Sequence, residues 1–142
     1  MIAIGCDHGA LELKEQLIEH LKKRGIECKD YGTYTNDSCD YPVYAKKVAE
    51  AILSGECEEG ILLCGTGIGM SMAANKIKGI RAALCSDCFS AQATKEHNNA
   101  NVLCMGARVI GPELAFRIAD TFLDSRFSND ERHIRRISML ED

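Results

Sequence analysis

Several features that mark other classes of protein are absent from this chain of 142 residues. No apolar run approaches the roughly 20 residues that cross a bilayer, so no membrane span is expected. The first residues, "MIAIGCDHG", lack the basic region and long apolar stretch of a secretory signal, which predicts a cytoplasmic protein. The net charge of −4 comes with no basic tail, and the arginines near the end are too few for a nucleic-acid footprint. We therefore expect neither a membrane nor a nucleic acid as a partner.

The sequence also lacks internal repeats, low-complexity tracts and linkers rich in proline or glycine. Its composition, 46% apolar and 27% charged, is that of a folded soluble protein. A chain of this length buries roughly two-thirds of its unfolded surface, which suits one hydrophobic core. We therefore expect residues 1–142 to form a single domain.

Eight cysteines are present, but their spacing fits neither a zinc site nor a disulfide framework. The one close pair, Cys85 and Cys88, has no second C-x-x-C and no neighbouring histidines. Disulfides are also disfavoured in the cytosol. Four cysteines lie in or at the ends of apolar runs, as buried reduced cysteines often do: Cys6, Cys64, Cys85 and Cys104. We expect these four in the core, and no metal site.

Short apolar runs alternate with segments of helical periodicity along most of the chain. The expected strands are residues 2–6, 26–32, 60–64, 80–85 and 101–106. The expected helices are residues 11–24, 41–54, 70–76, 89–97, 112–124 and 130–140. This alternation predicts an α/β fold in which a doubly wound, five-stranded parallel sheet carries helices on both faces. The continuous apolar runs "ILLC" and "VLCM" are typical of strands that are buried on both sides.

In such a sheet, ligands bind beyond the carboxyl ends of the strands, and two of these ends carry polar or glycine-rich segments. Asp7 and His8 follow the first strand, and the third leads into "CGTGIG", residues 64–69. The glycines permit a tight turn that brings backbone N–H groups toward an anion at the start of the next helix. The loop matches neither the dinucleotide fingerprint nor the P-loop. By itself it leaves an anion site and a purely structural turn equally open.

Cys64 stands where the third strand gives way to this loop. A thiol beside N–H groups at a helix N-terminus is favoured as the thiolate, which can act as a base or a nucleophile. The alternative is a buried strand-end cysteine like Cys104, with no chemical role.

Two histidines, His8 and His97, are expected on the ligand side of the sheet. A lone histidine is more often structural than catalytic, but two at one edge, with Asp7 and a nearby thiol, would form an acid/base set. Arg132 and Arg136 are one helical turn apart, which suits the binding of a phosphate. The alternative for these arginines is an ordinary solvated charged face.

Five blocks of sequence, taken together, resemble type B ribose-5-phosphate isomerase in nearly the same order and spacing across almost the whole chain. They are "GCDHGA", "DYPVYA", "CGTGIGMSMAANKIKGIRAAL", "EHNNANVLCMGARVIG" and "ERHIRRI". The resemblance implies a Rossmann-like fold and a cofactor-independent interconversion of ribose 5-phosphate and ribulose 5-phosphate. It also implies a homodimer, sometimes paired into a tetramer, with active sites at the subunit interface.

The resemblance places the family's thiol base, which moves a proton between C1 and C2, on Cys64. One branch of the family has a glutamate base at the position of Met70 and no cysteine, so this chain falls in the thiol branch. His97 would help to open the furanose ring, with Asp7 and Thr66 near the ring oxygens.

The remaining matched positions are expected to bind substrate. The N–H groups of the glycine loop would hold the enediolate oxygens. The segment that carries His97 and Asn98 would reach in from the partner subunit. The expected substrate contacts are His8, Tyr41, Gly65, Gly67, Ile68, Gly69, Met70, Ser71, Asn98, Arg108, Arg132 and Arg136.

The identity of the substrate stays open at this level. Subunits of galactose-6-phosphate isomerase are similar to this family, and some members accept allose 6-phosphate. The B-type subunit of the galactose enzyme typically lacks a histidine at the position of His97, which favours the pentose here. A hexose-6-phosphate isomerase is the second hypothesis. The third is a non-catalytic module that binds phosphosugars or nucleotides.

Overall fold

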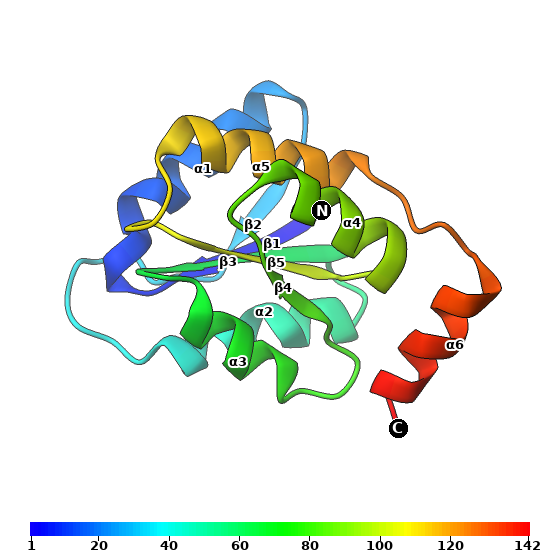
Figure 1. Ribbon diagram of the computed structural model, residues 1–142. Helices are drawn as coiled ribbons and strands as arrows, with labels where there is room; N and C mark the ends of the chain where they lie inside the picture. Colours follow the sequence, from blue (N-terminus) through cyan, green and yellow to red (C-terminus); the bar gives the residue numbers. More distant parts are fainter.

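The computed structural model describes residues 1–142 as a five-stranded sheet between two layers of helices (Figure 1). The strands are β1 (Ile2–Cys6), β2 (Cys28–Asp30), β3 (Glu59–Cys64), β4 (Ala82–Leu84) and β5 (Val102–Gly106). The helices are the short 3-10 turn η1 (His8–Ala10), α1 (Leu11–Lys23), α2 (Tyr41–Leu53), α3 (Ile68–Asn75), α4 (Cys88–Asn98), α5 (Pro112–Asp124) and α6 (Glu131–Leu140). None of them combines the length and apolarity that crossing a membrane requires.

The sheet is parallel throughout, in the order β2-β1-β3-β5-β4. The predicted α/β class and helices on both faces are confirmed. After β1 the chain crosses to β2 on one side, and after β3 it crosses toward β5 and β4 on the other. The carboxyl ends of β1 and β3 therefore lie at the point where the winding reverses, which is where open α/β sheets bind ligands. Cys6 pairs with Leu63 at this edge, and Cys64 pairs with Gly106.

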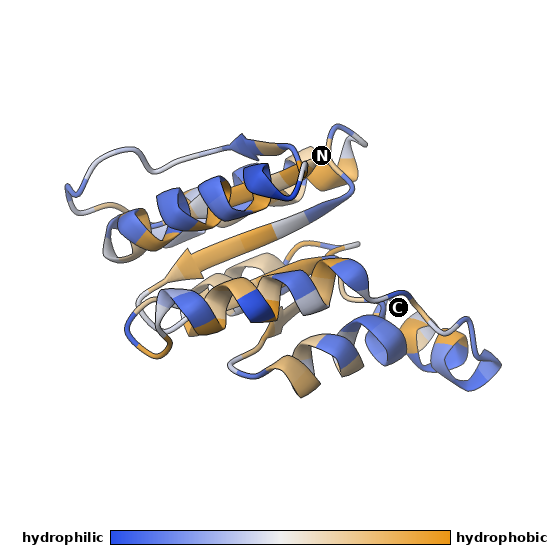
Figure 2. Cartoon of the chain, turned by 90° about the horizontal axis from the view of Figure 1, so that it is seen from above, coloured by the Kyte–Doolittle hydropathy of each residue, from blue (hydrophilic) through white to orange (hydrophobic).

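Two hydrophobic cores explain why the central strands are apolar at every position. Ile61 and Leu63 face a cluster of 20 buried residues under α1, α4 and α5. Leu62 and Cys64 face a cluster of 13 buried residues under α2 and α3. Successive strand residues point to opposite faces, so both sets must be apolar. In Figure 2, which looks down onto the sheet, a hydrophobic strand is visible beside a helix that carries many hydrophilic residues.

Helix α6 is the exception to this layered packing. Of its ten residues only His133 is buried, and it lies beside the end of α4, away from the layers over the sheet (Figure 1). Its apolar side chains Ile134, Met139 and Leu140 are exposed. Burial within its own chain therefore contributes little to holding α6 in place.

Two element boundaries differ from the sequence prediction in ways that matter for the site. Helix α3 begins at Ile68, two residues earlier than expected, because Gly67 adopts a left-handed conformation with φ of 80° that ends the turn sooner. Strand β2 has three residues instead of seven, because Tyr31 and Thr33 bond to the end of β1 as irregular backbone. The four cysteines expected in the core are buried, and all eight cysteines are free.

Candidate active site

Cys64 and Asp7 lie at the carboxyl ends of the neighbouring strands β3 and β1, where the winding of the sheet reverses. The Cys64 side chain is 5% exposed, and its Sγ accepts a hydrogen bond of 3.0 Å from the backbone N–H of Gly67. The N–H of Asp7 donates to Leu63 O at 3.1 Å, which ties the end of β1 to β3. An N–H donor directed at sulfur stabilises negative charge on it. The geometry therefore suits Cys64 to a role as a thiolate.

Four backbone N–H groups next to Cys64 have no acceptor within the chain. Those of Gly65, Thr66, Gly69 and Met70 form no backbone or side-chain hydrogen bond, whereas Ile68 N–H donates to Thr66 Oγ1 at 3.2 Å. They belong to the turn and first residues of α3, where the helix dipole adds positive potential. This arrangement is able to hold a negatively charged oxygen beside the thiol.

Met70 and Ser71 contribute to this site less directly than their sequence position suggests. The Met70 side chain is fully buried among α2, α3 and the sheet, so only its N–H is available to a ligand. Ser71 Oγ donates to Ile68 O at 2.7 Å. The turn of α3 thus presents backbone groups and the exposed Thr66 and Ile68 side chains at the sheet edge around Cys64 and Asp7, which we call the crevice.

Two glycines of the loop are required by close packing. A Cβ on Gly67 would lie 2.6 Å from Leu84 Cδ1 and 2.8 Å from the carbonyl carbon of Met105. A Cβ on Gly69 would lie 2.8 Å from the ring of Tyr41. The absence of side chains at these positions lets the loop sit directly on β5 and lets Tyr41 pack against the start of α3.

Gly67→Ala is expected to lower the free energy of unfolding by about 3 kcal/mol, because left-handed strain adds to a clash with the β5 backbone. The matched control is Gly55→Ala, since Gly55 also has positive φ, 82°, but nothing lies within 4 Å of a Cβ there. That variant should lose only about 1 kcal/mol. Urea unfolding of both variants measures the difference, and equal losses would contradict the clash.

His8 and Arg108 border the same crevice. His8 Nδ1 accepts a hydrogen bond of 3.2 Å from Cys39 N–H, which leaves Nε2 to carry the hydrogen of the neutral ring. The Arg108 side chain lies over Gly65, where a Cβ would be 3.5 Å from Arg108 Cδ, and Arg108 N–H donates to Gly65 O at 2.9 Å. Both side chains are exposed and supply donors suited to an anion.

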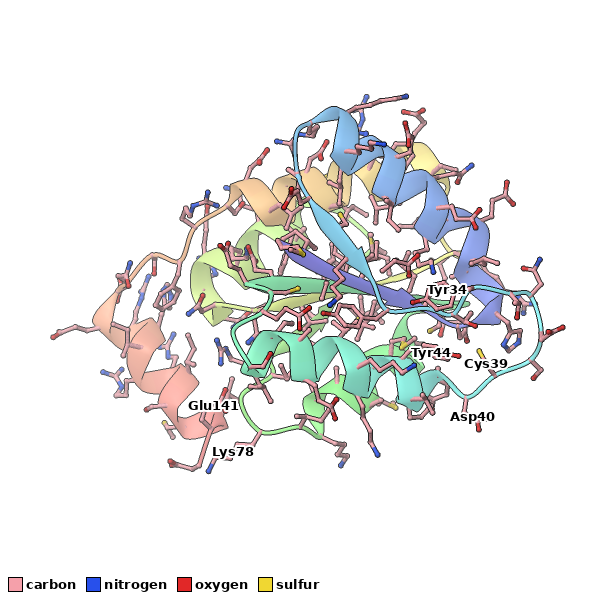
Figure 3. The ribbon with its side chains drawn as sticks, turned by 180° about the vertical axis from the view of Figure 1, so that it is seen from behind. Tyr34, Cys39, Asp40, Tyr44, Lys78 and Glu141 are labelled. Carbon is pink, nitrogen blue, oxygen red and sulfur yellow. The ribbon has the colours of Figure 1, made fainter.

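Sequence reasoning missed Cys39, which lies on the loop before α2 next to Asp40 (Figure 3). Its Sγ is 3.7 Å from His8 Nδ1, in addition to the backbone bond. The only signal was the presence of a cysteine in the polar loop, and its spacing does not point to His8.

Three of the other buried cysteines, Cys6, Cys85 and Cys104, are poor candidates for a base. Burial raises the pKa of Cys6 to about 12 and that of Cys85 to about 11. Burial also raises the pKa of Cys104 far above its usual range. These three thiols therefore stay protonated at neutral pH.

The prediction that His97 lies on the same side of the sheet as Cys64 is wrong for a single chain. His97 and Asn98 occupy the last two positions of α4, which carries the chain back to the start of β5. Val102 at that start pairs with Gly60, whereas Gly106 at the other end pairs with Cys64. Four strand residues span about 13 Å, so this histidine belongs to the opposite edge of the sheet.

A second cluster of polar residues forms there between α4 and α6. The rings of His97 and His133 have centroids 4.7 Å apart, and Ser128 Oγ lies 2.7 Å from His133 Nδ1. Burial lowers the pKa of His133. Arg132 and Arg136 are exposed on α6 next to it. His133 was missed by sequence reasoning, although its place between the two arginines was visible.

Neither a metal site nor a large hollow at the amino edge of the sheet coincides with Cys64. No group of three or more His, Cys, Asp or Glu side chains is placed to hold a metal ion. The hollow, about 1150 Å³, is lined by residues such as Arg24, Lys95 and Arg126.

Comparison with known proteins finds relatives over nearly the whole length of this chain. The family model of the ribose/galactose isomerases matches residues 2–140. The chain belongs to this family. Ribose-5-phosphate isomerase B of Escherichia coli is 48% identical over 139 residues, which cover 98% of this chain and 93% of that protein. Galactose-6-phosphate isomerase subunit LacB of Clostridium acetobutylicum is 45% identical over 127 residues, 89% of this chain and 73% of that subunit.

Structural comparison supports the same family. A crystal structure of a ribose 5-phosphate isomerase from Thermotoga maritima matches with a TM-score of 0.96 at 55% identity, over 99% of this chain and 96% of that chain. The resemblance drawn from the five sequence blocks and the Rossmann-like fold are thus confirmed. As a member of the ribose/galactose isomerase family, the chain is a sugar-phosphate isomerase.

Proposed function

We propose that this isomerase interconverts ribose 5-phosphate and ribulose 5-phosphate, with Cys64 as the base. The observation that carries the proposal is the Cys64 sulfur at the end of β3, beside the unpaired N–H groups at the start of α3. The thiolate takes the proton from C2 of the open-chain aldose, the C–H electron pair forms the C1–C2 double bond, and O1 takes the negative charge. The thiol then gives the proton to C1, while the O2 hydroxyl proton moves to O1 and the C2=O bond of the ketose forms. The N–H groups stabilise the oxyanion, so the reaction needs no cofactor.

The remaining steps fall to groups that the family resemblance assigns. His97 gives a proton to the ring oxygen as the furanose opens, with Asp7 and Thr66 beside the ring oxygens. Asn98 binds sugar hydroxyls and Tyr41 lines the site. Hydrogen-bond donors around the phosphate group orient the sugar phosphate. Most of the binding energy of this small substrate comes from its phosphate end.

We further propose that each active site is built from two copies of the chain. The crevice at Cys64 and the cluster between α4 and α6 lie at opposite edges of the sheet, so one chain does not bring them together. His8 and Arg108 of one copy would then hold the phosphate together with Arg132 and Arg136 of the other. The exposed apolar residues of α6 support this assembly, since they flank the arginines without a core of their own. A homodimer is the smallest assembly that completes the site, and a tetramer would contain two such pairs.

The reaction is tested by measuring kcat/KM of the chelator-treated protein for ribose 5-phosphate, allose 6-phosphate and galactose 6-phosphate. We expect the pentose to be preferred by at least about tenfold, which corresponds to about 1.4 kcal/mol of transition-state binding. Preference for a hexose would move the assignment to a hexose-6-phosphate isomerase, which the similarity to the galactose-6-phosphate isomerase subunit favours as the second candidate. Turnover of none of the three would contradict the proposed reaction.

A further inference from the structure

Arg81, at the approach to β4, joins two segments that lie far apart in the sequence. Its Nε and Nη2 donate to the carbonyl oxygen of Asn99 at 3.1 and 2.9 Å. Its Nη1 donates to Glu141 Oε1 at 2.7 Å. The same guanidinium therefore holds the residue that ends α4 and the residue that follows α6. We call these three hydrogen bonds the Arg81 clasp.

Helix α6 depends on such polar contacts at both of its ends. At its start, Ser128 N–H donates to Glu96 O at 3.0 Å, and Ser128 Oγ contacts the ring of His133. At its end, Glu141 also accepts from Gly79 N–H at 3.2 Å. Figure 3 shows Glu141 beside Lys78, at the opposite end of the molecule from Cys39. Because α6 buries only His133, loss of the contacts at Glu141 would leave its second half without a fixed position.

The end of α4 depends on the clasp in a different way. Asn99 caps the helix in a left-handed conformation, with φ of 47°, and its carbonyl oxygen accepts from Nε and Nη2 of the guanidinium. Asn98 and Arg81 line the same hollow of about 590 Å³. His97 and Asn98 immediately precede Asn99 in the chain, so the hydrogen bonds of Arg81 to Asn99 also limit where these two residues lie.

We propose that Arg81 is a positioning residue that sets the distance between the end of α4, with His97 and Asn98, and α6, with Arg132 and Arg136. This inference rests on the proposed function, in which these four residues act on one substrate. In the furanose form of a pentose 5-phosphate, only C4, C5 and the ester oxygen lie between the ring oxygen and the phosphorus, so the two groups are a short, narrowly limited distance apart. The helices that bind them must keep a fixed separation, since a misplacement of about 1 Å is enough to impair catalysis.

The first test is Glu141→Gln, which weakens only the α6 arm of the clasp. We expect KM for ribose 5-phosphate and the inhibition constant of inorganic phosphate to rise by about fivefold, with kcat within about twofold of wild type. Arg81→Met removes both arms, so kcat should also fall by about tenfold because His97 is no longer held. Arg81→Lys can reach one partner and should recover part of the loss.

The matched control is Arg117→Met, because Arg117 is exposed on α5 and its guanidinium makes no hydrogen bond. Its kinetic constants should equal those of wild type. A fall in kcat with unchanged KM for Glu141→Gln, or wild-type kinetics for Arg81→Met, would overturn the inference.

Hydrogen exchange separates this inference from the proposed reaction. Amides of α6 should exchange faster in Glu141→Gln and Arg81→Met than in Arg117→Met, with or without substrate. If the wild-type protein fails to convert ribose 5-phosphate, the proposed function fails, and the exchange data still decide on the clasp. Unchanged exchange of α6 would overturn the clasp itself.

Discussion

Cys64→Ser is expected to lower kcat for ribose 5-phosphate by about 100- to 10,000-fold, with little change in KM. Serine keeps the size of the side chain and an acceptor for the Gly67 N–H, but its hydroxyl is far harder to deprotonate than a thiol. Loss of the base therefore affects the proton transfer more than the binding of the sugar phosphate. Steady-state kinetics of the variant and the wild type, over a range of ribose 5-phosphate concentrations up to saturation, measure both kcat and KM.

The control for this substitution is Cys88→Ser, because Cys88 is half-buried at the start of α4 and takes no part in the crevice. Its kcat should stay within about twofold of wild type. If Cys64→Ser retained comparable activity, Cys64 would not be the base, and its place at the end of β3 would be structural.

The second large effect is the recovery of activity when two inactive variants are mixed. Cys64→Ser damages the crevice, and His97→Ala damages the cluster at the end of α4, so each homodimer has two defective sites. In a mixed dimer, one site receives both damaged residues and the other receives neither. After complete exchange of subunits, half of the dimers are mixed, so about a quarter of all sites should be intact. The measured kcat per chain should then rise from near zero to about a quarter of the wild-type value.

The control mixture combines Cys64→Ser with Asp7→Asn, because both residues lie at the same crevice. Every site in that mixture has one damaged crevice residue, so no activity should return. Native mass spectrometry confirms that subunits have exchanged. Failure of the first pair to recover activity, once mixed dimers are seen, would show that His97 and Cys64 do not meet across two copies.

The local pattern of the sequence was enough to predict the sheet and the glycine turn that follows Cys64. Continuous apolar strands require cover on both faces, and alternation with helices requires parallel connections, which together place Cys64 and Asp7 at one edge. Glycines at close spacing predicted a turn that presents N–H groups. The strands and the glycine turn depend on residues that are close together in the sequence, so they can be predicted from the sequence alone.

The resemblance predicted the family and the class of substrate, because the five blocks of sequence have nearly the same order and spacing as in that family. It also implies that His97 acts from another subunit, which stays a prediction, whereas the order of elements alone placed His97 on the wrong side of a single chain. An α-helix that follows a parallel strand returns the chain to the amino edge, so its last residues are remote from the strand ends.

What the sequence determined by itself is the α/β class, the parallel sheet, the glycine turn and the position of Cys64 at its start. The tertiary structure alone decided that Cys39 bonds to His8, that Met70 turns into the core, and that Arg81 joins Asn99 to Glu141. Periodicity and turn residues report burial and backbone conformation over a few residues. Contacts between segments that are 31 or 60 positions apart depend on how the layers pack, and no local pattern encodes that packing.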